Sequence, residues 1–493
     1  MRTRICLYVL LFLPLLVYWQ TIFCDYGLRG DYGFLREAHE DAGKLVKFTA
    51  SAGRPLYGAL LESSYATAGH VDQLPWMRLV SVLLLTVLGV VLWRQLYQSG
   101  WNEVEAAAIG LGVVLLPSAQ VVVGSAFCWP QALTLLLAMA GFSAIETEIE
   151  RGGLKRLVAL LGGCMIYTAA GLIYQSNVLF ALVPLTAVYL VRTGREPLSD
   201  LKWALIHLGT LAIGLLIGYL MMRSLISDGV FEASSRMQFE TNPFTKLLWF
   251  FSHPLPNALA LFALADDNYH GWMIYGGAIL AVLVLLGFAY RRSFKLADPA
   301  IRRRWQVCLF GLPFVMHAVS LVAAERSVSY RTLFPLAGLV LVLVIYSLHG
   351  FFEGAKLKYR LYYPLLALAF LGIAFVANRN SFELLATPQA DEWEIMQGYA
   401  LRANFSKGLR VFVITPRAED RSTERIYQDE FGTVSSLDGG TAQEMFRAAV
   451  RLRYPAKMPT GSSYTVASGR TPPKAGAYDL VIDMRKLRAL RGL

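Results

Sequence analysis

The feature that most constrains this chain is a series of apolar stretches, each about twenty residues long, in its first 380 positions. A helix needs about 20 mostly apolar residues to cross the hydrocarbon core of a bilayer. About eleven stretches meet this requirement. They lie near 5–23, 76–97, 104–123, 129–145, 155–173, 175–191, 203–222, 271–290, 305–324, 331–348 and 360–377. The sequence therefore predicts a polytopic α-helical membrane protein.

The composition agrees with a membrane protein. Of the 493 residues, 55% are hydrophobic and only 16% are charged, and the mean hydropathy is +0.46. Soluble globular proteins carry about 25% charged residues, so this chain has too little charge to cover a water-facing surface. A secreted soluble enzyme, a disordered protein and a nucleic-acid-binding module are therefore disfavoured.

The distribution of Lys and Arg predicts the orientation of the helices. Cytoplasmic loops of membrane proteins are enriched in Lys and Arg, which resist translocation. The basic residues fall in alternate loops, whereas the short loops near 124–128 and 173–176 contain neither Lys nor Arg. The basic loops contain Arg94; Arg151, Lys155 and Arg156; Arg192, Arg195 and Lys202; the segment 291–304; and Lys356, Lys358 and Arg360. This pattern places the N-terminus in the cytoplasm and, because eleven is odd, the C-terminus outside it.

Two further features concern the ends of the membrane helices. The first apolar stretch follows Arg2 and Arg4 but is long and lacks a small-residue cleavage site, so we expect an uncleaved first helix. The five cysteines have no metal-type or redox-type spacing. Cys24 and Cys128 fall on the same predicted outer side, where they could pair, but free thiols are expected.

The chain divides into a transmembrane domain, 1–379, and a small α/β domain, 380–493, outside the cytoplasm. The transmembrane domain has two long outer loops, 24–75 and 223–270. In the tail, 410–415 and 478–483 read as short buried strands and 441–453 has helical apolar spacing, whereas the stretch between them is rich in turn residues. The tail has no nucleotide loop, metal cluster or nucleophile motif, which favours a structural or acceptor-positioning role.

Candidate catalytic carboxylates lie in the first outer loop. Asp25 and Asp31 follow the first helix directly, with Arg29, Arg36 and Arg54 close in sequence. A carboxylate partly shielded from water has a raised pKa and can act as a general base toward a sugar hydroxyl. Ordinary solvated loop charges are the alternative reading. The sequence GRPLYG (53–58) predicts a tight turn that leads into a short interfacial helix.

A second group of candidates lies in the short outer loop AERSVSYRTLFPL (324–336). Glu325, Arg326, Tyr330 and Arg331 stand at headgroup depth between two apolar helices, where ionisable residues are costly unless paired or used. A Glu325–Arg326 pair with Arg331 reaching a lipid phosphate is the structural alternative. Two Arg in a short outer loop run against the positive-inside rule, which favours a function.

The other long outer loop contains the acidic pair Asp266 and Asp267. This pair could supply the base or bind a divalent ion, although a pair at an exposed helix start is the commoner case. His253 and His270 nearby lack helical metal-ligand spacing. We therefore expect no metal cofactor, while a divalent ion stays open.

Several of these motifs resemble the GT-C class of membrane glycosyltransferases, and more closely the serotype-converting glucosyltransferases that modify O-antigen. The resemblance rests on the acidic outer loop with its GRPL turn (53–56), on SAFCWPQALTLLLA (125–138) and on GLIYQSNVLFALVP (171–184). It covers roughly the first 200 residues. Members often carry two consecutive acidic residues in the first loop, whereas here Tyr32 follows Asp31. Either Asp31 or Asp25 can therefore hold the catalytic role.

The resemblance implies an inverting transfer of a sugar from polyprenyl phosphate to a lipid-linked or envelope glycan such as O-antigen. Asp31 or Asp25 would deprotonate the acceptor hydroxyl. Arg326, Arg331 and Arg54 would bind the donor phosphate, and Arg36, Tyr174, Gln175 and Tyr330 would bind sugar or acceptor. The implied location is the outer face of the bacterial inner membrane, in contact with membrane lipids and without a nucleic-acid partner.

Two other classes of function stay open at this stage. A lipid-glycan flippase or another transporter needs charged residues in the middle of its helices, and the stretches near 80–92, 108–122, 157–170 and 271–289 have none. A non-catalytic assembly protein that presents the C-terminal domain predicts no effect of neutralising Asp25, Asp31 or Arg331.

Overall fold

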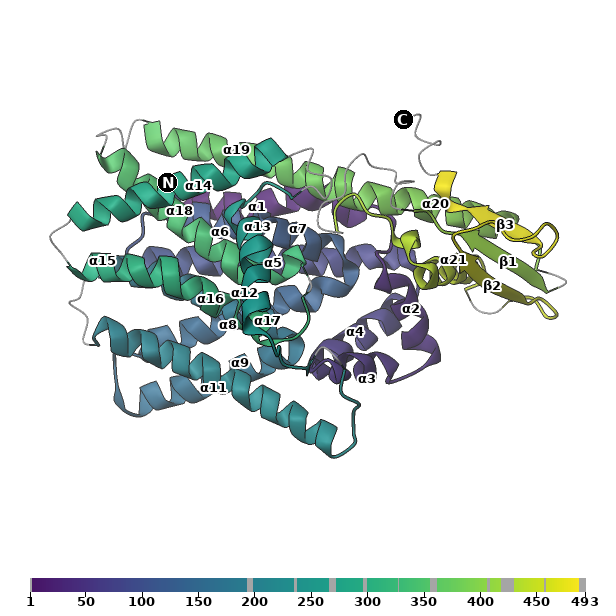
Figure 1. Cartoon of the computed structure of the whole chain (residues 1–493), viewed down its shortest axis with the longest axis horizontal. Helices are drawn as coiled ribbons and strands as arrows, with labels where there is room; N and C mark the ends of the chain where they lie inside the picture. The colour runs from purple at the N-terminus through teal and green to yellow at the C-terminus, as the bar shows by residue number, and fades with distance from the viewer. Residues whose placement is uncertain are drawn as a thin grey trace.

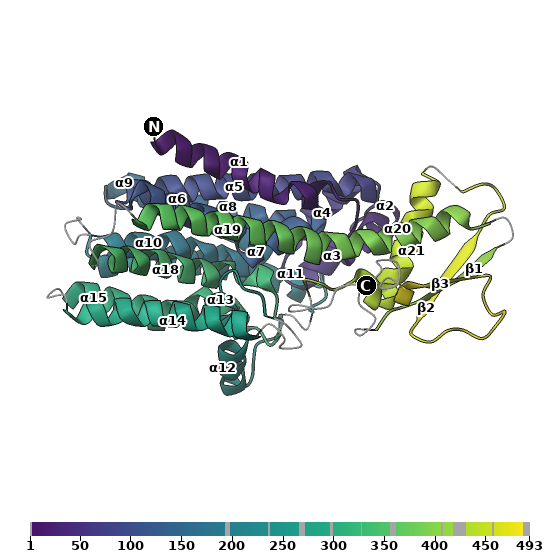
Figure 2. The same cartoon turned by 90° about the horizontal axis from the view of Figure 1, so that it is seen from above.

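The molecule is a bundle of long helices with a small α/β domain at one end, which we call the sheet end (Figure 1). The computed structural model describes residues 2–192, 198–234, 237–265, 272–295, 299–326, 328–354, 361–405, 408–417, 430–455 and 458–486. The first helix begins at the end of the bundle opposite the sheet, and the helices run roughly along one common direction (Figure 2). This arrangement is that of a polytopic membrane protein.

The apolar stretches predicted from the sequence form the long helices of the bundle. Among the described residues, eight helices are long and apolar enough to cross a membrane, or up to nine if the α6–α7 pair, bent by 48°, forms one crossing. The helices of the bundle are α1 (Arg2–Phe23), α5 (Leu74–Gln98), α6 (Glu103–Leu115), α7 (Pro117–Gly124), α8 (Trp129–Glu148), α9 (Gly153–Val178), α10 (Leu182–Val191), α11 (Asp200–Ser227), α14 (Trp272–Lys295), α15 (Pro299–Gln306), α16 (Leu312–Met316), α17 (Ala318–Val322), α18 (Phe334–Gly354) and α19 (Tyr363–Arg379).

The stretch from α9 to α10 passes along the bundle and back. Tyr174 interrupts the helical conformation with φ −155° and ψ 99°. Arg192, directly after α10, forms an ion pair of 3.2 Å with Glu150, just before α9. Because the two ends of the stretch meet, the chain reverses near Tyr174, as the separate predictions at 155–173 and 175–191 require.

The predicted crossing at 305–324 is a broken helix rather than a continuous one. A π-helical turn, Val307–Gly311, and a break at His317 separate α15, α16 and α17. Arg304, at its start, pairs with Asp200 at 2.8 Å, beside the first turn of α11. The backbone N–H of Ala324, at its far end, donates to the carbonyl of Gln238 beyond α11. The segment therefore runs the length of the bundle despite its breaks.

The two long loops predicted on the outer side are folded into helices. The first contains α2 (Gly30–Glu40), α3 (Lys44–Ser51) and α4 (Pro55–Ala68). The second contains α12 (Pro243–Ser252), which stands out from the bundle in Figure 2, and α13 (Pro254–Leu259). Helices α2 to α4 lie at the sheet end (Figure 1).

The C-terminal domain is built on a three-stranded parallel sheet. Its strands are β1 (Leu409–Ile414), β2 (Tyr464–Gly469) and β3 (Leu480–Asp483), in the order β2-β1-β3, and its helices are α20 (Thr387–Arg402) and α21 (Gly439–Arg453). The predicted strands at 410–415 and 478–483 and the helix at 441–453 are confirmed. The stretch that precedes β3 is rich in turn residues but also contains β2, a strand that the sequence did not predict and that pairs with β1 along its whole length.

A single helical rod joins the two predicted domains. Helix α19 continues through a π-helical segment, Asn380–Ala386, into α20 without a break. The boundary that we placed at residue 379 therefore falls inside a rigid element, and the C-terminal domain is mounted on the last membrane helix.

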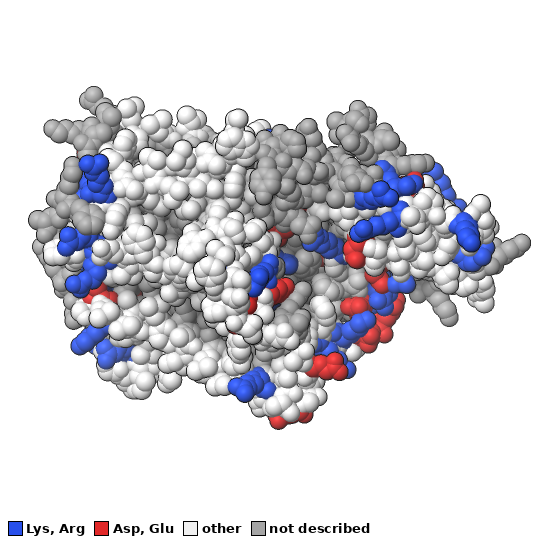
Figure 3. Space-filling view, in the orientation of Figure 1, with Lys and Arg blue, Asp and Glu red and all other residues white. Residues whose placement is uncertain are grey.

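The surface of the bundle is suited to a bilayer. On the face in Figure 3 the surface over the middle of the bundle is largely uncharged, and charged side chains gather toward the two ends. Large apolar side chains of α9, α14 and α19 are more than half exposed, among them Leu161, Val284 and Phe375. Lipid is the natural solvent for such a surface.

Candidate functional site

A cavity of about 430 Å³ lies between α9, α11, α17 and the loop that precedes α18. One part of its wall is apolar and includes Leu172, Leu215, Met222, Phe239, Val319 and Val322. The other part carries Arg54, Tyr174, Gln175, Glu325 and Arg331. Five of the residues singled out in the sequence, from three distant segments, therefore line one cavity.

Arg54 is directed into this cavity by a turn. Gly53 has φ 79°, a conformation that glycine adopts without strain, and Pro55 then begins α4. The Nε of Arg54 donates to the side-chain oxygen of Gln175 at 3.0 Å, and the guanidinium lies 4.1 Å from the centre of the Tyr174 ring. Gln175 in turn donates to the carbonyl of Gly53 at 2.6 Å. The non-helical backbone at Tyr174 thus presents two side chains that hold one arginine.

Arg331 enters the cavity from the short helix Tyr330–Thr332. Its Nη1 lies 3.8 Å from the sulfur of Cys128, and its Cζ lies 5.6 Å from the centre of the Phe127 ring. Its Nε is buried and has no hydrogen-bond partner within the described ranges. A buried N–H donor without a hydrogen-bond acceptor is costly, and an anionic ligand in the cavity would offset this cost.

Asp31 lies in the first turn of α2 and is 0% exposed. Its carboxylate accepts hydrogen bonds from the backbone N–H of Leu28 at 2.7 Å and of Phe127 at 3.2 Å, and from the hydroxyl of Tyr65. Burial raises the pKa of Asp31 to about 6, although these hydrogen bonds act in the opposite direction. Asp25, by contrast, is exposed.

Asp31 does not line the cavity, but one residue connects the two. The backbone N–H of Phe127 is bound by Asp31, and the Phe127 ring faces Arg331. The carbonyl of Phe127 accepts a hydrogen bond of 2.7 Å from Tyr57, whose ring lies 6.1 Å from that of Tyr174. The buried carboxylate therefore holds a segment that contacts Arg331 and Tyr57.

Other predicted site residues lie elsewhere. Arg326 forms an ion pair of 2.9 Å with Glu240 and does not line the cavity. The Tyr330 hydroxyl accepts a hydrogen bond from the N–H of Ala265 at 2.8 Å, and this side chain is 2% exposed. Arg36 pairs with Glu444 of the C-terminal domain at 2.8 Å.

The remaining acidic candidates cannot be placed. Asp266 and Asp267 lie outside the described residues. Within the described ranges there is no group of three His, Cys, Asp or Glu side chains arranged to hold a metal ion. All five cysteines are free thiols, including Cys24 and Cys128.

Sequence reasoning missed two charged residues that shape this site. Arg78 is fully buried and donates from its Nε to the carbonyl of Ile22 at 3.1 Å and from its Nη1 to that of Tyr26 at 3.0 Å, so it caps the end of α1. An arginine close to the start of an apolar stretch was the available signal. Glu430 accepts hydrogen bonds from the Ser329 hydroxyl at 2.5 Å and from the Tyr330 N–H at 2.8 Å, next to Arg331. No local pattern marks Glu430.

Comparison with known proteins gives no match to a family model and no match to a curated protein sequence. Among solved structures, the chain is similar to an oligosaccharyltransferase of Archaeoglobus fulgidus in complex with Zn and sulfate, with 11% identity and a TM-score of 0.45. That match covers 91% of this chain and 61% of the other, so the chain spans less than two thirds of that protein. It is also similar to ArnT from Cupriavidus metallidurans bound to undecaprenyl phosphate, with 12% identity, a TM-score of 0.44 and coverage of 90% and 84%.

Both solved proteins belong to the GT-C class of glycosyltransferases, the class that the sequence resembles. The identities are 11% and 12% and both TM-scores are below 0.5. Likeness at this level says nothing about chemistry, and the function is argued below from the residues of this chain.

Proposed function

We propose that this chain is a membrane glycosyltransferase that moves a sugar from polyprenyl phosphate to a cell-envelope glycan, with O-antigen as the leading acceptor. The observation that carries the proposal is the cavity whose lining combines Arg54 and Arg331 with a large set of apolar side chains. A polyprenyl phosphate matches this lining, because its anionic head suits the arginines and its isoprenoid tail suits the apolar side chains.

The two arginines suit a phosphate that becomes a leaving group. The planar guanidinium can donate two parallel hydrogen bonds to phosphate oxygens, and such charge-assisted bonds are roughly twice as strong as neutral ones. Arg54 is held by Gln175 and Tyr174, and Arg331 has an unused buried Nε. Arg54 is therefore fixed in position, and Arg331 has a donor left to bind a phosphate oxygen.

In the proposed reaction the acceptor hydroxyl loses its proton to a carboxylate as its oxygen attacks the anomeric carbon. The new glycosidic bond forms as the bond between that carbon and the phosphate oxygen breaks, which inverts the configuration. Polyprenyl phosphate leaves with the bonding electrons, and Arg54 and Arg331 stabilise the charge on it. A cationic clamp in a water-poor cavity is effective because the local dielectric is low.

Asp31 is the proposed base. A pKa raised to about 6 leaves it ionised at neutral pH and still able to accept a proton. Its two oxygens are occupied by Leu28, Phe127 and Tyr65, so an acceptor hydroxyl must replace the Tyr65 hydroxyl to reach it. Asp25 is the alternative base, since it is exposed and needs no such exchange.

The proposed location is the outer face of the bacterial inner membrane, with the N-terminus in the cytoplasm and the sheet end outside. Arg54, Arg331 and the C-terminal domain all lie at the sheet end, and this side agrees with the distribution of Lys and Arg in the loops. Reporter fusions at residue 60 and after residue 486 test this orientation. Cytoplasmic activity of either fusion would contradict it.

The activity itself is tested with purified protein in nanodiscs, radiolabelled polyprenyl-phosphate glucose and lipopolysaccharide as acceptor. Wild type is expected to release free polyprenyl phosphate and to label the glycan. Arg331→Ala is expected to lose transfer, and Arg331→Lys to keep part of it. The matched control is Arg379→Ala, because Arg379 is an exposed arginine paired with Glu383 outside the cavity.

The alternatives predict different outcomes in the same assay. A flippase binds the lipid-linked sugar without releasing polyprenyl phosphate. A non-catalytic assembly protein shows no difference between wild type and Arg331→Ala. Thermal unfolding of each variant separates loss of chemistry from loss of fold.

A further inference from the structure

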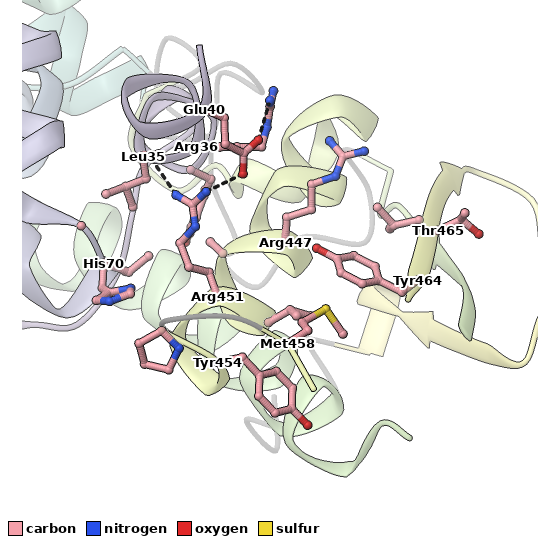
Figure 4. Close-up of a pocket in the computed structure, with 17 residues that line it drawn as sticks. Leu35, Arg36, Glu40, His70, Arg447, Arg451, Tyr454, Met458, Tyr464 and Thr465 are labelled. Carbon is pink, nitrogen blue, oxygen red and sulfur yellow. Dashed lines mark hydrogen bonds and ion pairs between the residues drawn. The ribbon is translucent and has the colours of Figure 1, made fainter. Parts of the chain in front are cut away.

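A second, larger cavity lies between the first loop and the C-terminal domain. Its volume is about 850 Å³, within the range of roughly 300–1,000 Å³ typical of ligand sites. Leu35 and His70 lie on one side, and Arg447, Tyr464 and Thr465 of α21 and β2 lie on the other (Figure 4). Tyr454 and Met458 complete the wall.

Three arginines line this cavity, and each of them is paired with a carboxylate. Arg451 donates to Glu40 at 2.6 Å and to the Leu35 carbonyl at 2.9 Å (Figure 4), while Arg36 and Arg447 both pair with Glu444. Each arginine is thus held in place by a carboxylate and still has further N–H groups to donate. Such a wall offers fixed donors and acceptors without a large net charge, which suits a ligand rich in hydroxyls better than a phosphate.

Two tyrosines supply aromatic rings on which a sugar ring can pack. Tyr464 packs against Phe405 and Phe446, and Tyr454 packs against Phe405, so both rings are supported from behind. Neither hydroxyl forms a hydrogen bond with the part of the chain that is described. A tyrosine combines an apolar face with a polar tip, and a sugar ring likewise has an apolar face and a polar edge.

The cavity shares a helix with the proposed base. Leu35, Arg36 and Glu40 line it from α2, whose first turn holds Asp31. Arg36 follows Asp31 by five residues, about 7.5 Å along a helix at 1.5 Å per residue. A chain bound here is therefore held by the same rigid element that carries the carboxylate.

We infer that this cavity is a subsite for the acceptor glycan, which binds an uncharged stretch of the saccharide chain away from the reacting hydroxyl. The inference rests on the proposed function for the identity of its ligand. Arg447 and Tyr454 contact the glycan, and the C-terminal domain thereby positions the acceptor.

The test measures glycan binding in the absence of any lipid donor. The full chain in nanodiscs is titrated against fluorescently labelled polysaccharide released from lipopolysaccharide by mild acid, with polarisation as the readout. Arg447→Ala is expected to weaken binding about tenfold, since a charged hydrogen bond is lost, and Tyr454→Phe about threefold. The matched controls are Arg410→Ala and Tyr478→Phe. Arg410 pairs with Asp479 and Tyr478 packs on Phe412, both on the same domain outside the cavity.

The controls are expected to bind within twofold of wild type. The inference is overturned if Arg447→Ala and Tyr454→Phe bind as the controls do, or if wild type does not bind the polysaccharide. Failure of the proposed function has a different signature, namely no release of polyprenyl phosphate although the polysaccharide is bound.

Discussion

The hydroxyl of Tyr65 donates a hydrogen bond to the carboxylate of Asp31 in a site where neither side chain is exposed. Tyr65 comes from α4 and Asp31 from α2, so this bond ties together two helices of the first loop. It also controls the chemistry of the carboxylate, because it stabilises the charged form against the effect of burial.

If Asp31 is the base, the rate of transfer rises with pH through about 6, because only the ionised carboxylate can accept a proton. Tyr65→Phe removes a hydrogen bond that lowers the pKa of Asp31, so the acid limb of the profile moves to higher pH. The measurement is kcat/KM for glucose transfer between pH 5 and 8. Asp31→Asn is expected to abolish the reaction. If Asp31→Asn instead stays active with an unchanged acid limb, the base is another group such as Asp25.

In the proposed donor site, Arg54 and Gln175 are expected to act as one unit. Gln175→Ala frees the Arg54 side chain. The losses of donor-binding free energy in Arg54→Ala and Gln175→Ala are therefore expected to add up to more than the loss in the double variant. A coupling free energy of about 0.5–3 kcal/mol in donor binding is expected for such neighbours. Additive effects would show that the cavity holds Arg54 by other means.

Glu430 positions the loop that carries Arg331. Glu430→Gln weakens the hydrogen bonds to Ser329 and Tyr330, and each bond to a charged group contributes about 1.5–3 kcal/mol. The expected result is a lower kcat with little change in donor affinity. Glu232→Gln, an exposed glutamate in the other long loop, is the matched control. A fall in donor affinity alone would indicate direct binding instead of positioning.

Glu392 fastens the C-terminal domain. Its buried carboxylate accepts the N–H groups of Ser435 at 2.6 Å and Ser436 at 3.0 Å. In Glu392→Gln the side-chain N–H₂ group faces a backbone N–H, so one buried donor has no acceptor. This lowers the free energy of unfolding by about 1–3 kcal/mol. Faster proteolysis of the C-terminal domain is expected, compared with the exposed Glu394→Gln as control. Equal cleavage of the two variants would contradict this role.

The features that could be predicted from the sequence are those that depend on local pattern. Apolar stretches of bilayer length became helices, Gly53 and Pro55 produced the predicted turn and helix start, and two β-branched runs became strands. These features follow from the thickness of the bilayer and from backbone preferences within a few residues. β2 escaped detection because its register depends on pairing with β1.

The packing of distant segments brings the candidate residues together. Arg54 and Gln175 are 121 positions apart, Arg331 and Cys128 are 203 apart, and Glu430 lies 100 positions from Tyr330. It also separated Asp31 from Asp25, since burial depends on what packs over a side chain and not on its neighbours in sequence. Contacts of this kind arise when distant helices pack, and the residue types along one segment carry no record of their partners.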